Sequence, residues 1–306
     1  MRAVPTYRAV VTDLDNTLYS WVDYIVPSLE AMVASLIETT GRPRIDIIQS
    51  LKAVYARYES NEYPFAIQES ALFHPYRADF DSFDALVVRP AQRAFAEARR
   101  RYLHPYPGVR ETLEALRAAS VTVVALTDAP RNAVENRIRL LGLEGLLDRL
   151  YALKGYALPA NVNPEIRRRD EAGHYRLKGT RVVELPREAE KPDPRGLRRV
   201  LRDLRLAPEE VLYVGDSLKK DMALAEAVGA TGVWAEYGTY VSTEYRERLE
   251  VISAKRVTQR HVPDEGEATG RWPLAISSFT RVRDLALAAA SPAPRRARVA
   301  PRRAAG

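Results

Sequence analysis

Aspartates follow two apolar segments of this sequence at the points where those segments end. Asp13 and Asp15 come directly after residues 7–12. Asp216 follows the apolar run 211–214. A carboxylate can attack phosphorus and form an acyl phosphate, which divides one difficult transfer into two easier steps. A second carboxylate two residues along can carry a proton to the leaving group, so the pattern indicates phosphoryl-transfer chemistry with Asp13 as the nucleophile.

Other side chains that can bind a phosphoryl group or a metal ion also lie near the ends of predicted strands or beside a proline. Thr127 comes directly after a strand-like run, and Lys191 stands before a proline. A hydroxyl and an ammonium can bind phosphoryl oxygens. Asp128 lies beside this predicted phosphate site, where we expect its side chain mainly to cap a helix. Asp221 is a candidate metal ligand, or else a first-turn acid favoured by the helix dipole.

Strands and helices alternate along the part of the chain that must position these residues. Predicted strands lie at 7–14, 121–126, 146–153, 211–214 and 232–235, with helices predicted at 109–119, 129–141, 195–206 and 218–228. This order predicts an α/β fold, with a parallel sheet and helices on both of its faces. In such sheets ligands bind beyond the carboxyl ends of the strands, where the polar residues named above are found.

Four motifs in this order resemble those of the haloacid dehalogenase (HAD) superfamily. They are Asp13-Leu14-Asp15-Asn16-Thr17, Thr127-Asp128, Lys191-Pro192 and Gly215-Asp216-Ser217 with Asp221. The resemblance extends over residues 7–237. It implies a Rossmann-like core, a type-one helical cap and phosphatase activity with Mg²⁺.

The resemblance also implies a role for each matching residue. Asp13 is the nucleophile, and Asp15 is the general acid and then the base. Thr127 and Lys191 hold the phosphoryl group. The implied Mg²⁺ ligands are Asp13, Asp216, Asp221 and the backbone carbonyl of Asp15. Relatives that remove a halide lack an acid at the position of Asp15, so its presence favours phosphoester chemistry.

The apolar spacing changes to a helical period between the first two predicted strands. We therefore predict an all-helical cap at 19–106 and a core formed by 1–18 and 107–290. Two polar segments, near 154–190 and 237–273, interrupt the core. In the first we predict a β-hairpin at 175–185. This segment either lies at the mouth of the site and affects substrate choice, or forms a surface insertion or dimer contact.

The second polar segment contains one predicted helix, and a terminal strand and helix are expected at 276–287. Five of the seven excess positive charges fall in 291–306, which we expect to be a disordered basic tail. The rest of the chain is nearly neutral, so we expect no nucleic-acid partner.

The sequence contains no cysteine and no apolar run of about 18 residues. The first observation excludes thiolate catalysis and zinc–thiolate sites. The second predicts no membrane span. We expect a cytoplasmic protein, either a monomer or a homodimer.

The substrate is the least specified part of the prediction. We expect a small phosphorylated metabolite, of nucleotide- or sugar-phosphate type, with Arg57, Arg77 and Arg131 as candidate substrate contacts. Two alternatives stay open: a phosphotransferase or mutase of the same superfamily, and a non-catalytic binding or regulatory protein on the same fold.

Overall fold

Seven strands form one parallel sheet in the computed structural model, which describes residues 7–159, 162–253 and 274–288. The order across the sheet is β4-β3-β2-β1-β5-β6-β7, and every neighbouring pair is parallel. The strands are β1 (Ala9–Thr12), β2 (Thr122–Pro130), β3 (Arg149–Leu153), β4 (Arg181–Leu185), β5 (Val211–Gly215), β6 (Thr231–Ala235) and β7 (Ala275–Ile276).

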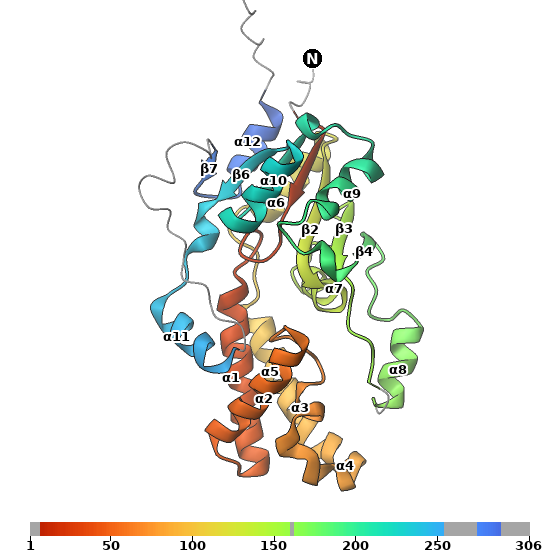
Figure 1. Ribbon diagram of the computed structural model, residues 1–306, viewed down its shortest axis with the longest axis vertical. Helices are drawn as coiled ribbons and strands as arrows, with labels where there is room; N and C mark the ends of the chain where they lie inside the picture. Colours follow the sequence, from red (N-terminus) through yellow and green to blue (C-terminus); the bar gives the residue numbers. More distant parts are fainter. Residues whose placement is uncertain (1–6, 160–161, 254–273, 289–306) are drawn as a thin grey trace, which may run out of the picture.

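Helices cover both faces of the sheet because successive side chains of a buried strand point in opposite directions. Val10 belongs to the apolar cluster under α6 (Val109–Ala118), α7 (Arg131–Leu140) and α12 (Arg281–Leu287). Val11 belongs to the cluster under α9 (Arg195–Leu204) and α10 (Ala223–Val228). The predicted α/β class with a Rossmann-like parallel sheet is therefore confirmed (Figure 1).

The chain leaves β1 and forms only helices and turns, apart from isolated bridges, before it returns to the sheet. This region contains α1 (Trp21–Thr40), α2 (Arg44–Tyr58), α3 (Ala66–Glu69), η1 (Ala71–Ala78), α4 (Phe80–Phe83), η2 (Asp84–Val88) and α5 (Arg89–Tyr102). The Ser20 side chain caps α1 by accepting from Asp23 N, and Gly41 ends it with a φ of 66°. The helices lie below the sheet in Figure 1. The domain boundaries at 18/19 and 106/107 stay a prediction.

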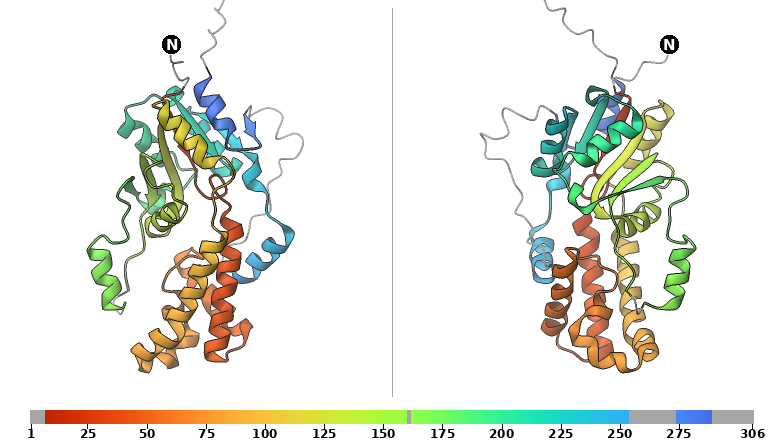
Figure 2. Two further views of the ribbon diagram at one scale, coloured as in Figure 1. Left: turned by 180° about the vertical axis from the view of Figure 1, so that it is seen from behind. Right: turned by 45° about the vertical axis from the view of Figure 1, so that its right-hand side comes forward.

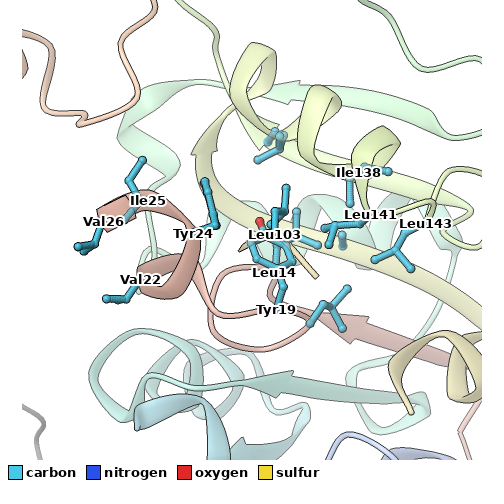
Figure 3. Packing of buried hydrophobic residues seen from close by; sticks show 14 of the residues in the cluster. Leu14, Tyr19, Val22, Tyr24, Ile25, Val26, Leu103, Ile138, Leu141 and Leu143 are labelled. Carbon is cyan, nitrogen blue, oxygen red and sulfur yellow. The ribbon is translucent and has the colours of Figure 1, made fainter. Parts of the chain in front are cut away.

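One apolar cluster continues from the sheet into the helical region. Figure 3 shows Tyr19 and Tyr24 near Leu14 and Leu103 at this junction, with Ile138 and Leu141 farther along the same cluster. Because these side chains are buried, the helical region is packed directly onto the core near the ends of β1 and β2.

After β6 the chain crosses η6 (Glu236–Thr239) and runs down the side of the helical region as α11 (Thr243–Ile252) (Figures 1 and 2). Lys52 donates to the Glu250 carbonyl at 3.2 Å, and Asn61 donates to the Ser253 hydroxyl at 2.7 Å. The predicted helix within 237–273 is therefore present and packs on the helical region. The other part of that segment, 254–273, lies outside the described residues, as does the predicted tail at 291–306.

A second excursion from the core, residues 154–180, carries α8 (Pro164–Glu171) along the opposite side of the helical region (Figure 2). The Tyr156 hydroxyl donates to the Tyr58 carbonyl at 3.1 Å. The Tyr156 ring also lies edge-on to the stacked rings of Tyr58 and Tyr63. This excursion therefore contacts the helical region through an aromatic cluster.

The predicted hairpin at 175–185 is wrong. Residues 181–185 form β4, which pairs in parallel with β3 at the edge of the sheet. The preceding backbone has other partners, since Leu177 N donates to Glu135 and Gly179 N donates to Glu144. The open edge of β3 and these two glutamates satisfy the backbone groups that a hairpin would have paired.

The terminal strand and helix are present as β7 and α12, close to the predicted 276–287. None of the described helices is both long and apolar enough to cross a bilayer.

Candidate active site

The site lies at the carboxyl ends of β1 and β5, where β1 is flanked by β2 on one side and β5 on the other. The strand order reverses at this point, and such a reversal opens a crevice for ligands. Asp13 N donates to the Val214 carbonyl at 2.8 Å and so continues the pairing one residue past β1. This backbone bond places Asp13 beside the residues that follow β5.

Lys191 connects the two strand ends through its ammonium group. Its Nζ lies 2.7 Å from an oxygen of Asp13 and 2.7 Å from an oxygen of Asp221. Asp221 also accepts from the Tyr213 hydroxyl and from Ser217 N, each at 3.0 Å. The carboxylate of Asp221 is thus held from three directions, and it fixes the lysine that faces Asp13.

Two glycines allow the loops of the site to approach this closely. A Cβ on Gly215 would lie 2.3 Å from Cγ of Asp221. A Cβ on Gly238 would lie 1.7 Å from the carbonyl oxygen of Asn16. The backbone of Asn16 has a φ of 57°, in the left-handed region. Any larger residue at these glycines would displace the carboxylate or the 13–17 loop.

The donor set fits a hard divalent cation. Asp13, Asp216 and Asp221 can each offer a carboxylate oxygen, and these oxygens lie within 4.8 Å of one another. Three carboxylates face one buried ammonium, so the cluster keeps an excess of negative charge. Burial raises the pKa of Asp13 to about 7, although Lys191 lowers it, and burial together with Asp221 raises the pKa of Asp216 well above its ordinary value. Mg²⁺ prefers such oxygen ligands.

Thr127 and Asp128 lie at the end of β2 and differ in their surroundings. The buried Thr127 hydroxyl accepts from Ala129 N at 3.1 Å, which leaves its own proton available to a phosphoryl oxygen. Asp128 accepts from Lys191 N at 2.9 Å and pairs with Lys220 at 2.8 Å. The expectation that Asp128 caps a helix is wrong, because the N-cap of α7 is Pro130. Its carboxylate instead holds the backbone of Lys191.

Asp15 lies beside Asp13 on the same loop and points toward α7. Its Oδ1 accepts from the Tyr19 hydroxyl at 2.6 Å and from Arg137. Burial raises the pKa of Asp15, while the guanidinium of Arg137 opposes that rise. The loop is fixed from behind by Tyr237, whose hydroxyl donates to the Thr17 carbonyl at 2.5 Å.

Sequence reasoning missed Arg137 and the residue behind it, Glu62. Arg137 is completely buried and contacts Glu62 at 3.5 Å. A signal was present, since Arg137 lies between Val134 and Ile138 on the apolar stripe of its helix. A charged residue in such a stripe indicates a buried partner.

Two of the three candidate substrate arginines, Arg57 and Arg131, are paired with glutamates. Arg57 pairs with Glu69 at 3.3 Å and is largely exposed. Arg131 pairs with Glu135 at 3.3 Å and with Glu184 at 3.2 Å. The side chain of Arg77 lies outside the described part of the chain. The structure does bring together Asp13, Asp15, Thr127, Lys191, Asp216 and Asp221; their chemical roles stay predictions.

Curated relatives cover most of this chain at low identity. A protein of Methanopyrus kandleri named glyceraldehyde 3-phosphate phosphatase is 25% identical over 78% of this chain and 88% of its own. A protein of Pseudomonas savastanoi named phosphoglycolate phosphatase is 26% identical over 76% of this chain and 70% of its own length. A solved structure titled a predicted phosphoglycolate phosphatase, from Haemophilus somnus, has a TM-score of 0.45 and 16% identity, over 90% of this chain and 96% of that one.

The sequence model of the haloacid dehalogenase-like hydrolase family matches residues 7–229 of this chain. This span contains β1 to β5, all four motifs and the whole helical region. The chain therefore belongs to the haloacid dehalogenase-like hydrolase family.

Proposed function

We propose that this protein is a Mg²⁺-dependent phosphatase that hydrolyses a small phosphomonoester through a phosphoaspartate on Asp13. The observation that carries the proposal is the contact of Lys191 with both Asp13 and Asp221, beside a carboxylate of Asp216. It supports roles for Asp13 as the nucleophile, Lys191 as the cation that binds the phosphoryl oxygens and Asp216 as a metal-binding group.

In the first step Asp13 attacks phosphorus, and the bond from phosphorus to the leaving oxygen breaks. Asp15 gives its proton to that oxygen, so the product leaves as an alcohol. Thr127 and Lys191 bind the phosphoryl oxygens during the transfer. In the second step Asp15 takes a proton from water, the water oxygen attacks phosphorus, and phosphate is released with Asp13 regenerated.

Asp13, Asp216 and Asp221 would hold the metal ion, together with the Asp15 backbone carbonyl. Bound there, Mg²⁺ supplies positive charge that offsets the charge of the transferring group. The protein itself contributes the fixed positions of the three carboxylates, which depend on Gly215 and on the strand pairing at Val214. This is why the site can be arranged before the substrate arrives.

The relatives support a small substrate. Their names specify phosphoglycolate and glyceraldehyde 3-phosphate, each a short phosphorylated chain. The helical region packed over the carboxyl ends of the strands is consistent with such substrates, because a cap that excludes water fits a small ligand. We therefore propose phosphoglycolate and glyceraldehyde 3-phosphate as the first compounds to test, ahead of larger sugar phosphates and nucleotides.

The test measures phosphate release from this panel with Mg²⁺ and with excess chelator. We expect wild-type turnover only with Mg²⁺, and a loss of more than about 10⁴-fold in Asp13→Asn, because the nucleophile is removed. Asp216→Asn should raise the Mg²⁺ concentration needed for half-maximal turnover, because one of the metal-binding carboxylates is removed. Asp46→Asn is the matched control, since Asp46 is an exposed acid on α2.

Three outcomes would contradict the proposal. Turnover that survives in Asp13→Asn would exclude this nucleophile. Transfer of the phosphoryl group to an added sugar without release of free phosphate would favour a phosphotransferase. No turnover across the panel, together with a stable partner recovered from extracts, would favour a binding protein.

A further inference from the structure

We infer that Arg137 is a positioning residue that holds Asp15 for proton transfer and links it to Glu62 of the helical region. The inference rests on the proposed phosphatase function and assigns a role to a residue outside the four motifs. Arg137 does not face the crevice, since its side chain has no exposed surface. It acts through Asp15, whose side chain is 28% exposed.

The contact with Asp15 selects one of the two carboxylate oxygens. Both Arg137 and the Tyr19 hydroxyl donate to Oδ1. Among the described residues, no hydrogen bond reaches Oδ2. Two donors on one oxygen fix the rotation of the carboxylate, so Oδ2 is the oxygen that can carry the proton. The guanidinium also lies over the Tyr19 ring, with Cζ 5.7 Å from its centre.

Glu62 holds the other side of Arg137. Its carboxylate lies 3.5 Å from Arg137 Nη2, and it accepts from the Tyr24 hydroxyl at 2.8 Å and from Trp21 Nε1 at 3.1 Å. Two hydrogen-bond donors and the ion pair with Arg137 therefore fix a carboxylate that comes from the loop after α2. The position of the helical region is in this way connected, through one guanidinium, to the acid–base residue.

A purely structural role explains this arrangement poorly. Arg137 occupies an apolar stripe of α7 between Val134 and Ile138, where an aliphatic side chain would pack without desolvating a charge. Within the part of the chain that the structure describes, its Nε and Nη2 have no hydrogen-bond partner, and Nη2 has only the 3.5 Å ion pair with Glu62. A buried guanidinium with incomplete partners calls for a specific explanation. Its charge-assisted hydrogen bond to a described residue is the one to Asp15, next to the proposed nucleophile.

The experiment compares two substrates whose leaving groups differ in their need for a proton. An alkyl phosphate such as phosphoglycolate leaves as an alkoxide unless Asp15 protonates it, whereas 4-nitrophenyl phosphate leaves as a stable phenolate. The quantity measured is kcat/KM, which reports only the steps up to the release of the leaving group. It is therefore insensitive to the later role of Asp15 as a base.

We expect Arg137→Met to lower kcat/KM for the alkyl phosphate about 100-fold, within the usual range for general-acid catalysis, and to lower it for 4-nitrophenyl phosphate less than about 5-fold. Asp15→Asn should show the same selectivity to a greater extent. Glu62→Gln should show a smaller selective loss, and Arg137→Lys a partial recovery. Arg110→Met, which removes a guanidinium that donates to the carbonyls of Leu141 and Gly142 after the same helix, should leave the ratio of the two substrates unchanged.

Equal losses for both substrates in Arg137→Met would overturn the inference and leave Arg137 a structural residue. A shift in melting temperature on adding Mg²⁺ checks that the variant is folded. If Arg137→Met does not fold, Glu62→Gln and Arg137→Lys decide by the same ratio. Absence of wild-type turnover with both substrates would instead contradict the proposed function itself.

Discussion

Lys191 is the one ammonium in direct contact with the Asp13 and Asp221 carboxylates among the described residues. Burial alone would lower the pKa of Lys191, but Asp13 and Asp221 raise it well above its ordinary value. The same burial raises the pKa of Asp13 to about 7. The charges at this site therefore favour either a proton or a cation on the carboxylates, and the two compete.

This competition predicts how stability depends on pH without metal. Asp13 has a folded pKa of about 7 against an ordinary value of 3.8, so its contribution is full below 3.8 and is lost as pH rises through about 7. In excess chelator, we expect the melting temperature of Asp13→Asn to exceed that of the wild type by more at pH 8 than at pH 5.

Added Mg²⁺ should reverse this difference at pH 8, because the cation binds the ionised carboxylates of the wild type. Thermal melts at the two pH values, with chelator or Mg²⁺, provide the measurement. A difference that does not change with pH would show that Asp13 is ionised in the folded protein at pH 5.

A second prediction at the scale of single residues concerns the effect of a substitution at Gly238 on kcat. A Cβ at this position would overlap the Asn16 carbonyl, so Gly238→Ala should displace the loop that holds Asp13 and Asp15. We expect at least a 10-fold loss of kcat, by analogy with the cost of a misplaced catalytic group. Gly41→Ala is the control. Its Cβ would meet nothing within 4 Å, although its φ of 66° also strains an alanine, and it should lose stability while keeping kcat.

At the level of elements, the excursion 154–180 has a specific contact with the helical region at Tyr156. Its ring lies against Tyr58 and Tyr63, and Arg187 lies over it at 4.7 Å from the ring centre. Deleting Asn161 to Thr180 is one way to test whether this excursion affects substrate choice, but it would also remove the hydrogen bonds of Thr180 with Gly145 N and the Leu147 carbonyl. Substitution of Tyr156 therefore tests the predicted role in substrate choice more sharply.

We expect Tyr156→Ala to change the ratio of kcat/KM between phosphoglycolate and a bulkier phosphate by about 5- to 10-fold, because losing one aromatic contact costs roughly 1 kcal/mol. Tyr156→Phe removes the hydroxyl, with its bond to the Tyr58 carbonyl, but keeps the ring, and should have a smaller effect. Tyr175→Ala, at an exposed position of the same excursion, is the control. An unchanged substrate profile in Tyr156→Ala would assign this excursion a role in surface structure alone.

The same elements show what the sequence could and could not predict. Strands that are buried on both faces are continuous apolar runs, so β1, β2 and β5 could be located from composition and order alone. The strand β4 could not, because an edge strand beside a polar loop has the same local pattern as a hairpin. Its pairing with β3 is a tertiary contact, which the local sequence pattern does not show.

For the site, the four motifs predicted which residues meet but not what lies behind them. Arg137 and Glu62 are 75 residues apart and come from different regions, so no local spacing connects them. The roles of Asp128 and Arg131 also depended on partners, Lys191 and Glu184, that only the fold brings near. The motifs identify the residues that line the site, whereas the residues that hold them in place from behind depend on how the chain packs.

At the scale of the whole molecule, the helical region is held by more than the two chain crossings near residues 18 and 107. The helix α11 packs on α1 and α2 from one side, and the excursion with α8 lies along the other (Figure 2). Rigid-body opening of the helical region would have to break the contacts of Asn61 with Ser253 and of Tyr156 with Tyr58. We therefore expect the chain segments on both sides to move with it.

The position of α11 has a consequence for how the molecule denatures. The buried surface of the helical region is completed by a distant stretch of sequence, because Leu249 and Ile252 of α11 pack onto it from beyond β6. A fragment limited to 19–106 would leave that surface bare, so its melting should be broad and non-cooperative. The intact chain should melt in one calorimetric transition with matching van't Hoff and calorimetric enthalpies. Two separate transitions would mean that the two halves of the protein are energetically independent despite their shared helix.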